Sequence, residues 1–301
     1  MYNGCITDVK GITAAHATNA QARTGCTVVI CKEGATGGVD VRGGAPGTRE
    51  TDAFAPINMV PAVHAVVLAG GSAYGLAAAD GVMRELEKKN IGYDVGVGKV
   101  PIVGSAVLFD LANGDMHVRP DAQMGAQAAL QAGKAPLKQG LHGAGTGATV
   151  GKLYGMEYQS PGGFGCASVQ IGPATLAAAV AVNAAGQIVN PVNGQLLQGA
   201  RDAQGNLLQG PPLAKPLQGT NTTIGLLATD AILTKAQAHR LAMLGHDGYA
   251  MAIHPVHTMY DGDTVFALAT NQFEVDPDVL FALSAEVMAR AIVNAVTRRD
   301  A

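Results

Sequence analysis

The sequence contains no tryptophan and few other aromatic or charged residues. Phe, Tyr and Trp make up 4% of the 301 residues, and Asp, Glu, Lys and Arg make up 14%. Hydrophobic residues reach 48%, so a large core must be built mainly from aliphatic side chains. The net charge is -3, and the basic residues form no stripe interleaved with aromatic residues, which argues against nucleic-acid binding.

Signals for secretion and for membrane insertion are also missing. The first residues, MYNGCITDVKGIT, have no basic region followed by an apolar run, and no stretch approaches about 18 consecutive apolar residues. The four cysteines form no CxxC pair; they are Cys5, Cys26, Cys31 and Cys166. We therefore expect a soluble, cytoplasmic protein with reduced thiols and no membrane partner.

Glycine is abundant, with 40 residues, and short β-branched runs bounded by glycine indicate strands. The runs lack clean alternation, as expected for strands covered on at least one face. We expect strands over 26–31, 65–69, 177–182, 224–228 and 265–269. We expect helices over 72–89, 121–134, 234–244 and 277 to about 298, with Thr234 and Asp276 as N-caps.

The order of these elements has no strict strand–helix–strand rhythm. It favours a single domain over 1–301 with an α+β architecture, a four-layer α/β/β/α sandwich, over a doubly wound sheet. A polar segment, 183–220, lies among the elements. Within it, Asn193-Gly194 predicts a hairpin turn, and 200–220 predicts a long loop or linker.

Two segments resemble sites for nucleotide or thiol chemistry and fail on inspection. GAGTGATVGKL, from Gly143, has Thr146 and Leu153 where a phosphate-binding loop needs Gly and Ser or Thr. A glycine-rich turn before a strand is favoured, with Lys152 in an apolar setting. Cys166 has no local cation or helix N-terminus to activate its thiol, so a small buried hydrophobic residue is favoured over a nucleophile.

HPVHTMYDGDT, from His254, is the strongest metal candidate. His254, His257, Asp261 and Asp263 are residue types that ligate zinc or iron. Pro255 argues against a helix that would turn both imidazoles to one point. Structural hydrogen bonds for the histidines, and a turn before the strand TVFALAT for the aspartates, are therefore favoured, and we expect no metal.

LAGGSAYGL, from Leu68, reads as a strand, a tight glycine turn and a helix. Backbone N–H groups at such a helix start can bind an anion or a developing oxyanion. Ser72 is not in a G-x-S-x-G elbow, which argues against that class of hydrolase. Tyr74 could donate a hydrogen bond from its hydroxyl or simply pack on the sheet.

GTNTTIGLLATD, from Gly219, places Asn221, Thr222 and Thr223 at the entrance of an apolar strand. An N-terminal threonine carries its own base, the free α-amine, whereas an internal threonine does not. Cleavage of the Asn221–Thr222 bond would expose such a threonine, and Asp261 and Asp263 could orient it. A plain junction between loop and strand is the alternative.

The chain resembles the L-aminopeptidase D-esterase/amidase (DmpA-type) peptidases, whose relatives include β-peptidyl aminopeptidases and nylon-oligomer endo-hydrolases. The resemblance covers nearly the whole chain. It is carried, in order, by ITDVKGITAAHAT, VDVRGGAPGTRETD, AVVLAGGSAYGL, GSAVLFDL, GAGTGATVGK, NTTIGLLATD and MYDGDTVFALAT.

The resemblance implies an α/β/β/α sandwich related to N-terminal-nucleophile hydrolases. It implies a precursor that cuts itself into residues 1–221 and 222–301, with Thr222 as the nucleophile. It also implies assembly as a homotetramer and no metal or organic cofactor.

The resemblance further implies roles for five residues beside the nucleophile. Asp261 and Asp263 would flank it, and Asn183 would stabilise the oxyanion or the nucleophile. Lys152 and Tyr74 match active-site positions in the nylon-oligomer hydrolase branch.

The sequence departs from the aminopeptidases of this family, which cut at Gly-Ser and use serine. It has Asn221-Thr222, with Asp261 in place of a serine and Asp263 in place of a glutamate. Amide hydrolysis of a small peptide or other small amide is therefore expected, rather than a defined aminopeptidase specificity. Endo-hydrolysis of amide oligomers, acyl transfer to an amine, and a non-enzymatic binding protein with an intact chain are the alternatives.

Overall fold

The computed structural model describes residues 2–210 and 221–298, and one long strand connects its two sheets. The first part of β2 (Thr24–Val41) pairs with β1 (Thr13–Asn19) and β4 (Val63–Ala69). Its last part pairs with β16 (Thr264–Phe273), after a register shift between Ile30 and Ala35. The nine-stranded path therefore continues from one layer into a second.

Each layer mixes parallel and antiparallel pairs. In the first, β4 runs parallel to β7 (Val103–Val107), which pairs with β3 (Thr48–Arg49). In the second, β10 (Gly163–Ile171), β11 (Ala174–Asn183) and β14 (Thr222–Ala231) are antiparallel neighbours. β14 then runs parallel to β16, and all ten residues of β14 are buried.

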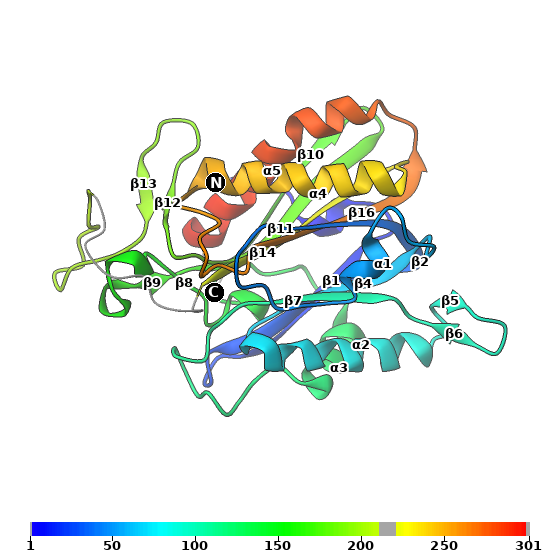
Figure 1. Ribbon diagram of the computed structural model, residues 1–301, viewed down its shortest axis with the longest axis horizontal. Coiled ribbons are helices and arrows are strands. Elements are labelled where there is room, and N and C mark those ends of the chain that lie inside the picture. The colour runs from blue at the N-terminus through cyan, green and yellow to red at the C-terminus, as the bar shows by residue number, and fades with distance from the viewer. Residues whose placement is uncertain (1, 211–220, 299–301) are drawn as a thin grey trace.

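Helices cover the outer face of each sheet (Figure 1). α2 (Ala78–Glu87) and α3 (Ala122–Gln131) lie against the first sheet, and α4 (Lys235–Ala252) and α5 (Pro277–Thr297) against the second. One apolar core lies between the sheets, where Val29 and Leu68 of one meet Leu226 and Phe266 of the other. The predicted four-layer α/β/β/α sandwich is confirmed.

The expected elements are present, with different bounds for several of them; the strand expected over 26–31 continues to Val41, and the helix expected over 121–134 ends at Gln131. The side chains of Thr234 and Asp276 cap α4 and α5 as predicted. α4 continues beyond the expected end at 244, because Gly245, Tyr249 and Ala252 continue its buried face. The helix expected from 72 begins as a 3-10 helix, Ser72–Ala77, because Gly71 and Ser72 have positive φ.

The remaining elements are short, and one confirms a predicted turn. They are α1 (Thr51–Phe54), β5 (Tyr93–Asp94), β6 (Lys99–Val100), β8 (Thr149–Val150), β9 (Ser160–Pro161), β12 (Gln187–Val189), β13 (Leu196–Gln198) and β15 (Ile253–His254). β12 and β13 form the hairpin predicted from Asn193-Gly194, with Gly194 at φ +70. Of the predicted 200–220 loop, 200–210 turns back through an Arg201–Leu207 bridge, and 211–220 lie outside the described residues.

The expectation of reduced thiols is wrong for one pair of cysteines. Cys5 and Cys166 form a disulfide across 161 residues of sequence, so Cys166 is not merely a buried apolar residue. The spacing gave no sign of this pair, because the fold brings the N-terminal segment onto β10, where Ser168 N–H donates to the Asn3 carbonyl (3.2 Å). Cys26 and Cys31 are free and buried.

In the described part of the chain, α5 alone has the length and hydropathy of a membrane-spanning helix. Its most apolar window has a mean hydropathy of 1.7, and 61% of that window is buried inside the fold. Burial against β10 and β11 accounts for this composition, as in a core helix.

Candidate active site

Three segments meet where β14 begins, and the Asn221–Thr222 bond lies at their meeting point. Thr222 stands opposite Asn183, the last residue of β11. Asn221 forms an isolated parallel bridge with Asp261, which precedes β16. Both residues of the bond are 4% exposed. The predicted cleavage site is thus a buried junction and is held on both sides.

The backbone N–H of Gly262 contacts both groups that self-cleavage would use. It lies 3.1 Å from Thr222 Oγ1 and 3.3 Å from the carbonyl oxygen of Asn221. The Thr222 hydroxyl donates to the same carbonyl oxygen. A Cβ at position 262 would lie 2.8 Å from Thr222 Oγ1 and 2.7 Å from the Ala45 carbonyl, so only glycine allows this approach. Donors on a carbonyl oxygen stabilise the negative charge that it gains under attack.

Lys152 and Asn183 form a buried pair beside this junction. Lys152 Nζ donates to Asn183 Oδ1 (2.8 Å) and to its carbonyl oxygen (3.1 Å). Asn183 Oδ1 also accepts from Thr149 N–H, and Asn183 Nδ2 donates to the Phe109 carbonyl. These contacts fix the amide of Asn183 and bring Lys152 to the residue that faces Thr222.

Burial changes the protonation of the groups around this pair. Loss of hydration lowers the pKa of Lys152 to about 7, although the charges of Asp261 and Asp110 oppose the change. Burial, and then the charge of Asp263, raise the pKa of Asp261 to about 6, against hydrogen bonds from Thr258 and the charge of Lys152. Burial also raises the pKa of Asp110. A lysine and a carboxyl group that titrate near neutrality are what general acid–base chemistry needs.

The two aspartates predicted to flank the nucleophile are held by the preceding loop. Asp261 Oδ2 accepts from the backbone N–H (2.8 Å) and the hydroxyl (2.6 Å) of Thr258. Asp263 Oδ1 accepts from Thr223 N–H (2.7 Å), and its Oδ2 accepts from His257 Nδ1 (2.8 Å). Both carboxyl groups are buried, and neither contacts solvent freely.

Tyr74 is the one predicted site residue that stays outside this cluster. It is 60% exposed, and the Arg119 guanidinium lies 3.9 Å from the centre of its ring. Within residues 2–210 and 221–298, no hydrogen bond joins its phenol to the Thr222 cluster. Its role in the site stays a prediction.

The histidines of the predicted metal motif do not face one point. His254 Nε2 pairs with the Ala250 carbonyl oxygen (3.0 Å), whereas His257 turns toward Asp263. No group of three or more potential metal ligands occurs in the described ranges. Hydrogen bonding, the alternative to a metal site, is therefore the role that the structure gives both histidines.

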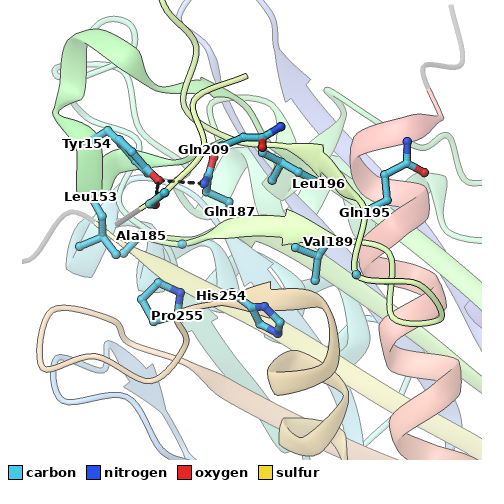
Figure 2. Close-up of a pocket in the computed structure, with 13 residues that line it drawn as sticks. Leu153, Tyr154, Ala185, Gln187, Val189, Gln195, Leu196, Gln209, His254 and Pro255 are labelled. Carbon is cyan, nitrogen blue, oxygen red and sulfur yellow. Dashed lines mark hydrogen bonds between the residues drawn. The ribbon is translucent and has the colours of Figure 1, made fainter. Parts of the chain in front are cut away.

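A cavity of about 670 Å³ begins one or two residues along the chain from the Lys152–Asn183 pair, neither member of which lines it. Its wall includes Leu153, which follows Lys152 and whose N–H donates to the Ala185 carbonyl (3.2 Å). Figure 2 shows Tyr154 and Gln187 hydrogen-bonded to each other on this wall, with His254 and Pro255 beside them. Among its described lining residues, there is no Asp, Glu, Lys or Arg.

Ala185 lies two residues beyond Asn183, which stands opposite Thr222. Two extended residues span roughly 7 Å, so the cavity wall begins at most that distance from Asn183.

Sequence reasoning missed Gly262, Thr258 and Asp110 as parts of the site, and it favoured structural hydrogen bonds for His257 without naming Asp263 as the partner. The segment MYDGDT did indicate two of the carboxylates, and the glycine between them was visible as a residue that tolerates close approach. Asp110 carried no such signal, because it reaches Gly71 N–H and Thr24 through the tertiary fold.

Comparisons with known proteins identify the family of this chain. A family model described as Peptidase family S58 matches residues 4–300. An uncharacterised aminopeptidase of Mycobacterium leprae is 45% identical, over 93% of this chain and 83% of that protein. A 6-aminohexanoate-oligomer endohydrolase of Kocuria sp. is 30% identical, over 96% of this chain and 84% of that protein.

A solved structure extends the comparison to the fold. The L-aminopeptidase D-Ala-esterase/amidase from Ochrobactrum anthropi, described as a variant of the Ntn hydrolase fold, superposes with a TM-score of 0.72 at 19% identity. The match covers 97% of this chain and 85% of that chain.

Proposed function

The chain belongs to peptidase family S58 and is a hydrolase of peptide or amide bonds, and from that premise we propose that Thr222 is its nucleophile, freed by self-cleavage after Asn221. One observation carries the proposal. The Gly262 N–H contacts both the Thr222 hydroxyl oxygen and the Asn221 carbonyl oxygen, at a buried junction beside a lysine of lowered pKa.

The proposed cleavage is an acyl shift followed by hydrolysis. The Thr222 hydroxyl oxygen bonds to the Asn221 carbonyl carbon while Gly262 N–H stabilises the oxyanion. The C–N bond between the two residues then breaks, and the nitrogen takes up the proton that left the hydroxyl. Water hydrolyses the resulting ester, which leaves a carboxylate on Asn221 and a free hydroxyl and α-amine on Thr222.

Lys152 is the proposed carrier of that proton. A pKa of about 7 leaves much of it neutral near neutral pH, and a neutral amine can accept a proton. Asn183 holds its Nζ at the strand position opposite Thr222. Once the chain is cut, the α-amine of Thr222 can itself act as the base for attack on a substrate amide.

The cavity suggests the class of substrate. Its described lining combines aliphatic side chains with the amides of Gln187, Gln195 and Gln209, without a lysine, arginine or carboxylate. Such a surface suits an uncharged acyl group that offers amide or apolar contacts. We propose small peptides and other small amides whose acyl part is uncharged.

Endo-hydrolysis of neutral amide oligomers is the second candidate that the uncharged lining favours.

A panel of chromogenic amides tests this function. Aminoacyl p-nitroanilides with neutral, acidic and basic side chains, each free or N-acetylated, would be assayed with and without an amine acceptor such as hydroxylamine. We expect release of the free acid from the neutral substrates without the acceptor, and no turnover by Thr222→Ala. Turnover that requires the acceptor would instead assign an acyltransferase. Equal turnover by the variant would remove Thr222 from the mechanism.

Assembly as a homotetramer is a further proposal, supported by the family resemblance, and a cytoplasmic location is another. Light scattering on the eluting peak of a gel-filtration column tests the first. A disulfide is more common in oxidising compartments, so the cytoplasmic proposal requires that Cys5 and Cys166 be reduced in the cell. Thiol labelling of rapidly quenched cells tests that requirement.

A further inference from the structure

We propose that His257 is a positioning residue for the reaction at the junction, because it holds Asp263 and thereby aims the Gly262 N–H at Thr222 and Asn221. The proposal rests on the proposed function of Thr222. It concerns a histidine that the reaction itself does not use.

Two consecutive residues hold the carboxylates on either side of Gly262. Thr258 binds Asp261 Oδ2 through its backbone N–H and its hydroxyl. His257 binds Asp263 Oδ2 through its backbone N–H (3.1 Å) and ring Nδ1 (2.8 Å). Gly262, the residue between the two aspartates, is therefore held on both sides. Its N–H is the donor that reaches the Thr222 oxygen and the Asn221 carbonyl.

The backbone of His257 is adapted to this contact. Its φ is +57, in the left-handed region that is uncommon for residues other than glycine, although histidine, asparagine and aspartate occupy it more often than most. In this conformation the backbone N–H and the ring reach the same carboxylate oxygen. Such conformations cost energy and persist where the surroundings determine them, often at functional sites.

Among the described residues, the imidazole ring of His257 makes one hydrogen bond, to Asp263. It makes a T-shaped contact with the ring of His246, with the centroids 4.8 Å apart, and the centroid of the Tyr249 ring lies 6.2 Å away. Nε2 is buried and has no hydrogen-bond partner among the described residues. Because a carboxylate oxygen only accepts, Nδ1 carries the hydrogen in its contact with Asp263. The Asp263 bond is thus the polar contact that orients the imidazole.

The contact extends to the strand that carries the nucleophile. The second oxygen of Asp263, Oδ1, accepts from Thr223 N–H at 2.7 Å. His257 therefore holds a carboxyl group that is bound to the residue after Thr222 and covalently linked to Gly262. Loss of the ring donor would let Asp263 rotate and would move the Gly262 donor relative to both junction oxygens.

Three variants separate the ring donor from the space and the backbone that it occupies. His257→Gly keeps the backbone N–H, suits the positive φ and removes the ring. His257→Leu fills the space without a donor. His257→Asn restores a donor near the position of Nδ1 and tolerates positive φ. His239→Ala is the matched control, since His239 lies on α4 and its Nδ1 has no partner in the described part of the chain.

The full chain would be made by cell-free translation with a radioactive pulse, and the cut fraction would be followed through a chase on denaturing gels. We expect self-cleavage to slow roughly 10- to 100-fold in the Gly and Leu variants, since small misplacements of a catalytic group have effects of this size. The Asn variant should stay within about threefold of the wild type, and the control should be unchanged. In the mature enzyme, kcat should fall in the same order, with KM within about twofold.

The outcomes distinguish the positioning role of His257 from packing alone and from failure of the proposed function. Equal cleavage rates in the wild type and in both donor-free variants would overturn the positioning role. Equal slowing in all three variants, Asn included, would assign His257 to packing alone. A wild type that is never cut would instead overturn the proposed function. If one donor-free variant does not yield folded protein by circular dichroism, the other still tests whether the ring donor is needed.

Discussion

The two ends of β14 both bury carboxyl groups, and they do so in different ways. At the far end, Asp230 is 3% exposed, and its oxygens accept from the backbone N–H groups of Thr175 (2.6 Å) and Lys10 (3.3 Å). At the near end, Asp261 and Asp263 are bound by Thr258 and His257, beside Lys152 and the Asn221–Thr222 bond.

The difference separates burial that only fixes the structure from burial that also shifts pKa values. Asp230 is bound by the backbone N–H groups of Lys10 and Thr175, and backbone donors do not titrate. It therefore acts as a cross-link from β14 to these two segments. The near end combines a lysine and a carboxyl group whose pKa values burial has moved toward neutrality. Such an arrangement is costly for stability and is found mostly at functional sites.

The largest effect is expected from Thr222→Ala. The variant keeps the fold, because the buried residue changes little in size, but it has no hydroxyl to attack Asn221. Self-cleavage and turnover should both disappear, and a denaturing gel should show one chain after incubation of days. A variant that still cuts after Asn221 would contradict the assignment of the nucleophile.

Replacement of the proposed proton carrier should follow in size. Lys152→Met keeps much of the side-chain volume and removes the amine, so self-cleavage should slow by roughly 10²- to 10⁴-fold, the usual contribution of general acid–base catalysis. Pulse–chase labelling measures the rate. A rate within threefold of the wild type would show that another group carries the proton.

The pH dependence of the wild type should locate the same groups. Proton transfer from the Thr222 hydroxyl needs a deprotonated acceptor, and the pKa values of Lys152 and Asp261 are about 7 and about 6. The cleavage rate should therefore fall as the pH is lowered from 8 to 5, as each group takes up a proton. A rate that is constant over this range, or that rises on acidification, would contradict a role for either group.

Asn183→Ala should have a smaller effect on the rate. It removes the oxygen that accepts from Lys152 Nζ and from Thr149 N–H, so the lysine loses its orientation but stays in place. We expect kcat to fall roughly 10-fold, since misoriented groups lose much of their contribution. Stopped assays on the best neutral p-nitroanilide measure it, and an unchanged kcat would argue for a structural asparagine.

The smallest effect on activity is expected at the far end. Asp230→Asn places an amide group where two backbone N–H donors converge, so one donor loses its acceptor. The free energy of unfolding should fall by about 1–3 kcal/mol, as for other unsatisfied buried groups. Urea titration measures this change. Activity should stay within twofold; a large loss would mean that the two ends of β14 are not independent.

Local sequence patterns predicted the elements, and the resemblance predicted most of the site. Thr234 and Asp276 marked helix starts by capping chemistry, and the glycine-bounded aliphatic runs marked β11, β14 and β16. These features depend on neighbouring residues, which a sequence displays.

The features that were missed depend on residues far apart in the chain. Cys5 meets Cys166, and Asp110 meets Gly71 and Thr24, only because the layers bring them together. The pairing of His257 with Asp263 spans only six residues, but it depends on a left-handed backbone at His257 that most histidines do not adopt.

Self-cleavage of the Asn221–Thr222 bond is measured by the intact mass of the purified wild-type chain. After incubation at neutral pH, the account predicts two species, residues 1–221 and 222–301, with a free α-amine on Thr222 confirmed by N-terminal sequencing. A single uncut chain of 30.5 kDa, or a smaller species that begins at any other residue, would contradict it.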